Sequence, residues 1–466
     1  MKIDQTLTPA GLRRPLEVLF EASAAKVRAL NQRWEPRFGA PVFTQGGKYT
    51  TRGWTEWTQG FQYGAALLQW EVTGEAEFLA MARQGIHDVM ASHVSNVGVH
   101  DHGFNNVSTY GNLRRLILEG RAADAGDVPA CELALKVSGA IQAARWTRIA
   151  DGGFIYSFNG PHSLFVDTIR SLRSLALAHQ LGHVLMGEGD RPINLLDRLV
   201  QHARATAQYN VYYGEGRDTY DVPGRTAHEA IFNVIDGAFR CPSSQQGYSP
   251  FTTWTRGLAW AVLGFSELLE YLASVPDSEL DPLGGRAAIS SFLERAARVT
   301  CDFYLDATPL DGIPYWDTGA PGLTFLGDYL SRPADPFNAY EPVDSSAAAI
   351  SAQGLLRLGR YLLRQGDASG QRYWQAGLTV SRALLNPPYL STDPNHEGLL
   401  LHVIYHRPNG WDYVPAGAKV PSGESAMWGD YHLRELALLL WREAKGEAYL
   451  TFFGPEEARS EAVAGG

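Results

Sequence analysis

The sequence contains few cysteines and no long apolar stretch. Cys131, Cys241 and Cys301 are too few and too scattered for a disulfide framework or a CxxC metal site, so we expect buried thiols. No run of about 18 apolar residues occurs, and the first residues lack a basic segment followed by an apolar one. We therefore expect a soluble cytoplasmic protein that does not bind a membrane.

Basic residues are scarce relative to acidic ones. The chain has 40 Lys and Arg against 50 Asp and Glu, which gives a formal net charge of -10. Binding to nucleic acid depends on clustered Lys and Arg, and no such cluster occurs, so we expect no nucleic-acid partner. An anionic small ligand would need a local cation at its site to overcome this average field.

Motifs for metal, nucleotide and nucleophile chemistry are also missing. There is no HExxH, no CxxC and no third ligand spaced to complete the His-Asp-His run at 100–102. No GxSxG, P-loop or dinucleotide fingerprint lies between a strand and a helix. We expect neither a metal nor a cofactor. His100, His102 and His228 should then hydrogen-bond to sugar hydroxyls or pack in the core.

What the sequence does contain is helical periodicity, with apolar residues at three- and four-residue intervals. Strand-like alternation is rare, and no linker divides the chain, so we expect an all-α protein with a single domain over residues 1–466. Helices are predicted at 12–33, 55–73, 75–92, 104–120, 127–145, 162–181, 192–208, 256–273, 285–304, 344–364, 371–386 and 424–443.

Polar and aromatic clusters recur at the start of every second predicted helix. They read WTEWTQGF, HDHGF, HSLFVDTIRSL, WTRGLAW, DSSAAAI and GDYHLREL. The alternate helices look like ordinary amphipathic covering helices, so we predict an inner and an outer ring. If the inner helices run parallel, the clusters converge on one mouth, where helix N-termini favour an anionic ligand.

Two long connections are predicted to form the rim of this mouth. Residues 209–251 have local strand character and are too long for a turn. Residues 315–340 are rich in Pro, Gly and Asp, and we expect them to wall the cleft as well.

Asp101 and Asp167 lie at or near the starts of two inner helices. A single Asp there is usually an N-cap, but two that face one aromatic mouth favour acid–base chemistry on sugars. A neighbouring carboxylate and burial raise the pKa of an Asp, so one of the pair can hold a proton. Arg256 and Trp260 share a helix face. In one reading, Arg256 binds a carboxylate of the ligand and Trp260 stacks on a sugar ring. In the other, Arg256 forms a salt bridge at the helix end and Trp260 packs in the core.

The motifs HDHGF, VDTIRSL, QQGYSPFTTWTRGLAW, PYWD, DSSAAAISAQGLL and WGDYHLREL, in this order, resemble those of the unsaturated glucuronyl hydrolases of glycoside hydrolase family 88. The resemblance implies an (α/α)6 barrel of six inner and six outer helices, with a small β-like rim region. It also implies hydration of the C4=C5 double bond of an unsaturated uronic acid in lyase-generated oligosaccharides. Asp167 would be the acid–base catalyst and Asp101 its essential neighbour. Substrate-binding positions would be His228, Gln246, Arg256, Trp260, His100 and Trp57.

This chain departs from the family pattern in two places. GGFIYSFNGPHSLF, ahead of Asp167, lacks an expected Trp, and His432 replaces a Tyr in GDYHLREL. Three other readings stay open: an inverting glycosidase that uses the same Asp pair on saturated sugars, an unsaturated galacturonyl-rhamnose hydrolase, and a non-catalytic sugar-binding barrel.

Overall fold

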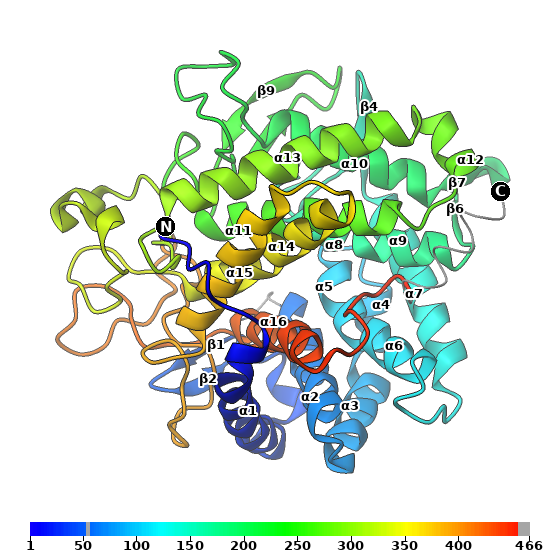
Figure 1. Cartoon of the computed structure of the whole chain (residues 1–466). Coiled ribbons are helices and arrows are strands. Elements are labelled where there is room, and N and C mark those ends of the chain that lie inside the picture. The colour runs from blue at the N-terminus through cyan, green and yellow to red at the C-terminus, as the bar shows by residue number, and fades with distance from the viewer. Residues whose placement is uncertain (53–55, 455–466) are drawn as a thin grey trace.

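The chain is mostly helical in a computed structural model that describes residues 1–52 and 56–454 (Figure 1). One set of helices forms a closed ring in which each helix contacts the next. In ring order these are α2 (Gln59–Thr73), α5 (His102–Asn106) with the π-helical turn η4 (Val107–Gly111) and α6 (Asn112–Leu118), α8 (Thr168–Ser171) with α9 (Arg173–Gln180), α11 (Thr255–Leu272), α14 (Ser345–Arg364) and α16 (Met427–Lys445).

A second set of helices covers the ring from outside. These are α1 (Arg13–Arg33), α3 (Ala76–Val89), α7 (Asp127–Ala144), α10 (Leu195–Tyr209), α13 (Arg286–Ala307) and α15 (Gly370–Leu384). Burial separates the two sets. Every residue of α11 is buried, whereas α13 buries a stripe that includes Ile289, Leu293 and Ala297. A helix that is buried all round belongs inside, and one with an apolar stripe belongs on the cover.

Glycines allow the ring helices to approach closely. A Cβ added at Gly103 of α5 would lie 2.2 Å from the Ser171 carbonyl oxygen of α8, and one at Gly60 of α2 would lie 2.3 Å from the Asn105 carbonyl oxygen of α5. Gly264 of α11 and Gly354 of α14 meet the backbone of the preceding ring helix in the same way. Small residues at these crossings therefore set the width of the ring.

The predicted helices correspond to the observed ones with small differences at the ends. The prediction for 192–208 is wrong at its first three residues, Pro192–Asn194, which form a strand. Residue 55, predicted to begin a helix, lies outside the described residues. The prediction for 162–181 is wrong at its start, because Ser163–Phe165 form strand β5. This strand depends on pairing with residues more than 60 positions away, which local periodicity cannot report. The predicted helix at 104–120 begins at His102 and contains η4.

The strand character predicted for 209–251 is confirmed. β8 (Glu229–Phe232) pairs with β5 on one side and with β9 (Phe239–Ser243) on the other. Three hairpins complete the strands: β1 (Phe43–Gln45) with β2 (Lys48–Thr50), β3 (Trp146–Ile149) with β4 (Gly152–Ile155), and β6 (Val184–Met186) with β7 (Pro192–Asn194).

Two of the three cysteines are buried as predicted, Cys131 and Cys301. The prediction is wrong for Cys241, which is exposed on β9. Within the described ranges, no helix combines the length and the apolar character needed to span a membrane.

Candidate active site

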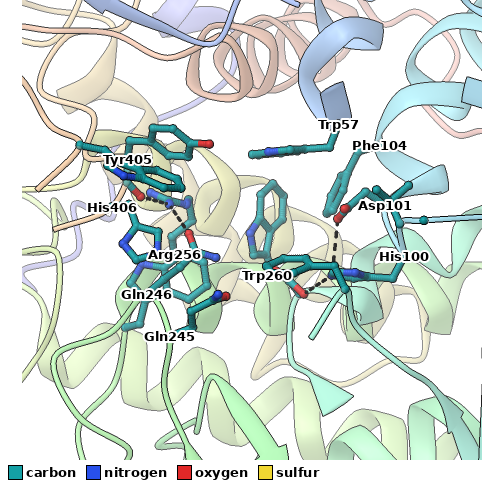
Figure 2. A pocket seen from close by; sticks show the side chains of 16 residues that line it. Trp57, His100, Asp101, Phe104, Gln245, Gln246, Arg256, Trp260, Tyr405 and His406 are labelled. Carbon is teal, nitrogen blue, oxygen red and sulfur yellow. Dashed lines mark hydrogen bonds and ion pairs between the residues drawn. The ribbon is translucent and has the colours of Figure 1, made fainter. Parts of the chain in front are cut away.

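A cavity of about 300 Å³ opens where the starts of several ring helices meet (Figure 2). Trp57 precedes α2, Asp101 precedes α5, Asp167 precedes α8, and Arg256 and Trp260 belong to the first turns of α11. The complete lining is Trp57, Gly98, Val99, His100, Asp101, Phe104, Phe158, Asp167, Gln245, Gln246, Trp254, Arg256, Trp260, Tyr405, His406 and Trp411. Of the eight predicted site residues, all but His228 lie on this surface.

Asp101 and Asp167 meet on either side of His100. His100 Nε2 lies 3.6 Å from Asp101 Oδ1 and 3.4 Å from Asp167 Oδ1. The imidazole is 1% exposed and the two aspartates are 9% and 8% exposed, so water reaches this group only through the cavity. Two carboxylates and an imidazole in contact can hold and pass a proton.

The ionisation of the three groups is coupled. Burial raises the pKa of Asp101 to about 6; His100 opposes this rise and Asp167 adds to it. Burial also raises the pKa of Asp167, but His100, with His228 and Arg256 farther away, outweighs burial and holds it below its ordinary value. Burial lowers the pKa of His100, but the two carboxylates raise it above its ordinary value overall. The free site therefore keeps Asp167 ionised, and Asp101 is the carboxyl group that takes up a proton more readily.

Aromatic rings form the middle of the cavity. Trp57 stacks on Trp428 with ring centroids 5.2 Å apart, and Trp260 packs against Phe104 at 4.8 Å. In Figure 2 the indoles of Trp57 and Trp260 lie between the Asp101 end and the Arg256 end of the cavity. His432 is fully buried and lies 5.0 Å from Trp260, so it supports the ring from the core. Flat apolar rings of this kind suit the C–H face of a pyranose.

The guanidinium of Arg256 is hydrogen-bonded to other groups of the protein. Nη1 donates to Asp344 Oδ2 at 2.9 Å and to the Ile404 carbonyl, while Nη2 donates to Gln246 Oε1 at 3.1 Å and to the Tyr405 carbonyl at 2.7 Å. Of the two readings left open for this arginine, the structure therefore contains the salt bridge. Its charge still faces the cavity, because Arg256 belongs to the lining.

His228 lies behind the cavity wall, where Nδ1 accepts hydrogen bonds from the backbone N–H groups of Gln245 and Gln246 at 3.0 and 3.3 Å. Burial lowers the pKa of His228 to about 4, so the ring is neutral, as an accepting nitrogen requires. His228, which the family resemblance implies as a substrate-binding residue, does not belong to the cavity lining; it holds the backbone of Gln245 and Gln246, which do. Gln245, which the sequence did not single out, lines the cavity, and its buried Oε1 has no hydrogen-bond partner.

One wall of the cavity consists of residues that no sequence motif indicated. Tyr405, His406 and Trp411 come from the long connection between α15 and α16, whereas no lining residue comes from 315–340. The prediction for 315–340 is therefore wrong. That segment instead supports the rim, where Asp317 Oδ2 accepts a hydrogen bond from the Tyr248 N–H at 2.8 Å. An irregular loop has no periodicity, and only the run YHRPNGW could have drawn attention to it.

Phe158 belongs to the segment ahead of Asp167 that lacks the expected Trp. It belongs to the lining, and its ring centroid is 5.7 Å from His100 and 5.3 Å from Phe165. A smaller aromatic ring therefore closes the cavity beside the two aspartates. Among residues 1–52 and 56–454, no three His, Cys, Asp or Glu side chains are grouped in a way that could hold a metal ion.

The chain matches no protein-family model, but it is similar to curated hydrolases along most of its length. An unsaturated glucuronyl hydrolase of Bacillus sp. (strain GL1) is 26% identical over 415 residues, which cover 86% of this chain and 90% of the relative. An unsaturated chondroitin disaccharide hydrolase of Streptococcus agalactiae is 22% identical over 398 residues, covering 84% and 82%. The crystal structure of the unsaturated glucuronyl hydrolase from Bacillus sp. GL1 matches with a TM-score of 0.66 at 24% identity, covering 91% of this chain and 96% of the other.

Proposed function

We propose that this chain removes a 4,5-unsaturated uronic acid from the non-reducing end of lyase-generated oligosaccharides. The chain belongs to the unsaturated glucuronyl hydrolase family and is a glycoside hydrolase of that type. The observation that carries the proposal is the contact of Asp101 and Asp167 with one imidazole on the surface of an aromatic-lined cavity. We further infer that the two helix sets form an (α/α)6 barrel as a single domain, since the ring closes through contacts between successive inner helices.

In this proposal Asp167 is the acid–base catalyst. The C4=C5 bond is conjugated to the ring oxygen as an enol ether, so it accepts a proton at C4 and leaves positive character at C5. Asp167 delivers that proton, and the resulting carboxylate then removes a proton from the water that adds to C5. The product is a hemiketal, which opens and releases the remaining sugar.

The two ends of the cavity suit the two parts of such a substrate. The Arg256 end carries positive charge and the amides of Gln245 and Gln246, which favour a uronate carboxylate. The sugar ring would lie against Trp57 and Trp260, with C4 and C5 toward Asp167. Asp101 would contact a ring hydroxyl. Because Arg256 is already engaged, the carboxylate would meet it mainly through its charge and through Gln246.

The inverting alternative is less well supported. An inverting pair places its carboxyl groups roughly 6.5–9.5 Å apart, on opposite faces of the scissile bond. Here carboxylate oxygens of Asp101 and Asp167 lie 3.6 and 3.4 Å from the same ring nitrogen, so the two oxygens are at most about 7 Å apart, near or below the lower end of that range.

The test uses lyase-generated unsaturated disaccharides and follows the ultraviolet absorbance of the conjugated double bond. Absorbance should fall with at least one of them, and Asp167→Asn should lower kcat by about 1,000-fold or more. Asp151→Asn, at the exposed turn between β3 and β4, is the matched control and should retain full activity. Release of saturated sugar from saturated oligosaccharides, with no loss of absorbance on any unsaturated one, would overturn the proposal.

A further inference from the structure

His100 is in contact with the proposed acid–base catalyst Asp167. Asp167 must donate a proton to carbon, yet in the free site His100 and the more distant Arg256 hold its pKa low, so it is ionised near neutral pH. A neighbouring group can supply the proton, and His100 Nε2 lies 3.4 Å from Asp167 Oδ1.

His100 is placed as a shared proton carrier rather than as an ordinary sugar ligand. Its imidazole is enclosed by the rings of Phe158 and Phe165, at 5.7 and 5.5 Å between centroids. Among the described residues, the ring nitrogens have no hydrogen-bond partner apart from the long contact of Nε2 with Asp167, so no other group locks the ring as a donor or as an acceptor. Nε2 instead faces one carboxylate oxygen of each aspartate.

The charged groups around His100 come from several elements. Asp101 at the start of α5 and Asp167 before α8 favour the imidazolium, whereas Arg145 after α7 opposes it. His102, His202 and His228 also feel the charge of His100, but burial lowers the pKa of each of them to about 4, 3 and 4. These three rings are neutral at pH 7, so the two aspartates dominate.

We infer that His100 stores the proton which Asp167 delivers to C4, and that His100 is therefore a positioning residue for general acid catalysis. The inference rests on the proposed function. Substrate binding displaces water from the cavity and brings a second anion near Asp167, which favours its protonated form. The imidazolium Nε2–H then passes its proton to Asp167 Oδ1, and His100 becomes neutral.

Protons are conserved over one turnover. Asp167 gives its proton to C4 as the C4=C5 electron pair forms the new C–H bond. Water adds to C5 and loses a proton to the Asp167 carboxylate. That proton returns to Nε2 of His100, which restores the starting state with no outside acid or base.

The first test measures the protonation state of His100 by NMR spectroscopy and does not depend on activity. In the protein with ¹⁵N-labelled histidines, the resonances of His100 are identified by their loss in His100→Gln. They should be those of an imidazolium at pH 7. In Asp167→Asn, His100 should titrate at least about one pH unit lower. His102 is the internal control and should be neutral at pH 7. A neutral His100 ring at pH 7 in the unmodified protein would overturn the inference.

The second test separates proton supply from sugar binding. His100→Gln should lower kcat by about 100-fold or more and leave KM within about 3-fold, and the alkaline limb of its kcat profile should move to lower pH. Imidazole should restore part of the activity of His100→Ala. His87→Gln, on the exposed side of α3, is the matched control. A rise in KM with kcat unchanged would overturn the inference. The two tests also separate this inference from the proposed function. If His100 is charged at pH 7 but no unsaturated disaccharide is a substrate, the proposed function is wrong, while the sharing of a proton between His100 and Asp167 is retained.

Discussion

At the scale of single residues, burial makes the charge on Asp101 costly. The pKa of Asp101 rises to about 6, chiefly because the side chain is buried. A carboxyl group with a raised pKa in the folded state stabilises the fold below its unfolded value, and loses that contribution as pH rises through about 6. Asp101 therefore lowers stability at the pH where the site has to work.

Asp101→Asn should accordingly raise the free energy of unfolding at pH 7.5 by about 1–3 kcal/mol, because a neutral isostere removes the buried charge. At about pH 2.5, below the pKa of Asp101 in both the folded and the unfolded state, the variant and the unmodified protein should unfold alike. Denaturant melts at the two pH values measure the difference, and activity should fall in the variant. Equal stability gains at both pH values would contradict the explanation.

Arg256 is the second residue whose structural role can be measured. Its ion pair with Asp344 is fully buried, so Arg256→Met leaves a buried carboxylate without its partner. The variant should lose about 3–5 kcal/mol of unfolding free energy. Arg256→Met combined with Asp344→Asn should lose less than the sum of the single variants, since it removes both charges. Additive losses would show that the pair does not couple.

At the scale of secondary structure elements, glycines and the starts of helices control the site. The start of α5 carries Asp101, and Gly103 two residues later lets α5 touch α8, which follows Asp167. The contact between these two helices thus sets the distance between the aspartates.

Gly103→Ala should lower both stability and activity, because a Cβ there would lie 2.2 Å from the Ser171 carbonyl oxygen and force the helices apart. We expect a loss of about 1–3 kcal/mol, as for other overpacked core positions, and at least a tenfold loss of kcat/KM. Thermal melts and the absorbance assay measure the two effects. Gly11→Ala is the control, since its added Cβ meets only Thr8 Oγ1, at 3.4 Å. A fully active Gly103→Ala would refute the link between this crossing and the site.

At the scale of the whole molecule, the net charge of -10 opposes an anionic substrate. Long-range repulsion between exposed charges weakens as salt shortens the Debye length from about 30 Å at 0.01 M to about 8 Å at 0.15 M. The site can attract a uronate through local positive charge, which Arg256 supplies at the cavity surface.

KM for an unsaturated disaccharide should therefore fall a few-fold when ionic strength rises from about 0.01 to 0.15 M, with kcat little changed. A methyl ester of the same disaccharide lacks the charge and should show no such dependence. A KM that rises with salt would mean that local attraction dominates over the molecular field.

Most of the helical architecture could be predicted because each helix carries its own evidence. The period of apolar residues reports which face is buried, and the clusters at Trp57, Asp101, Asp167 and Arg256 report which helix starts matter. The three-stranded sheet could be anticipated only as strand character in 209–251, since its pairing with β5 is non-local. The loop that carries His406 and Trp411 has no periodic signal at all.

By itself the sequence determined the helical periodicity and the alternation of inner and outer helices, because these follow from residue type and spacing along each helix. It also marked Asp101 and Asp167 as candidates, from their places at the starts of two inner helices. Only the tertiary structure decided that His100 lies between Asp101 and Asp167, that Arg256 is engaged by Asp344, and that His228 lies behind the wall. The physical reason is that hydrogen bonds, ion pairs and pKa shifts depend on distance and burial, which are set by segments far apart in the chain.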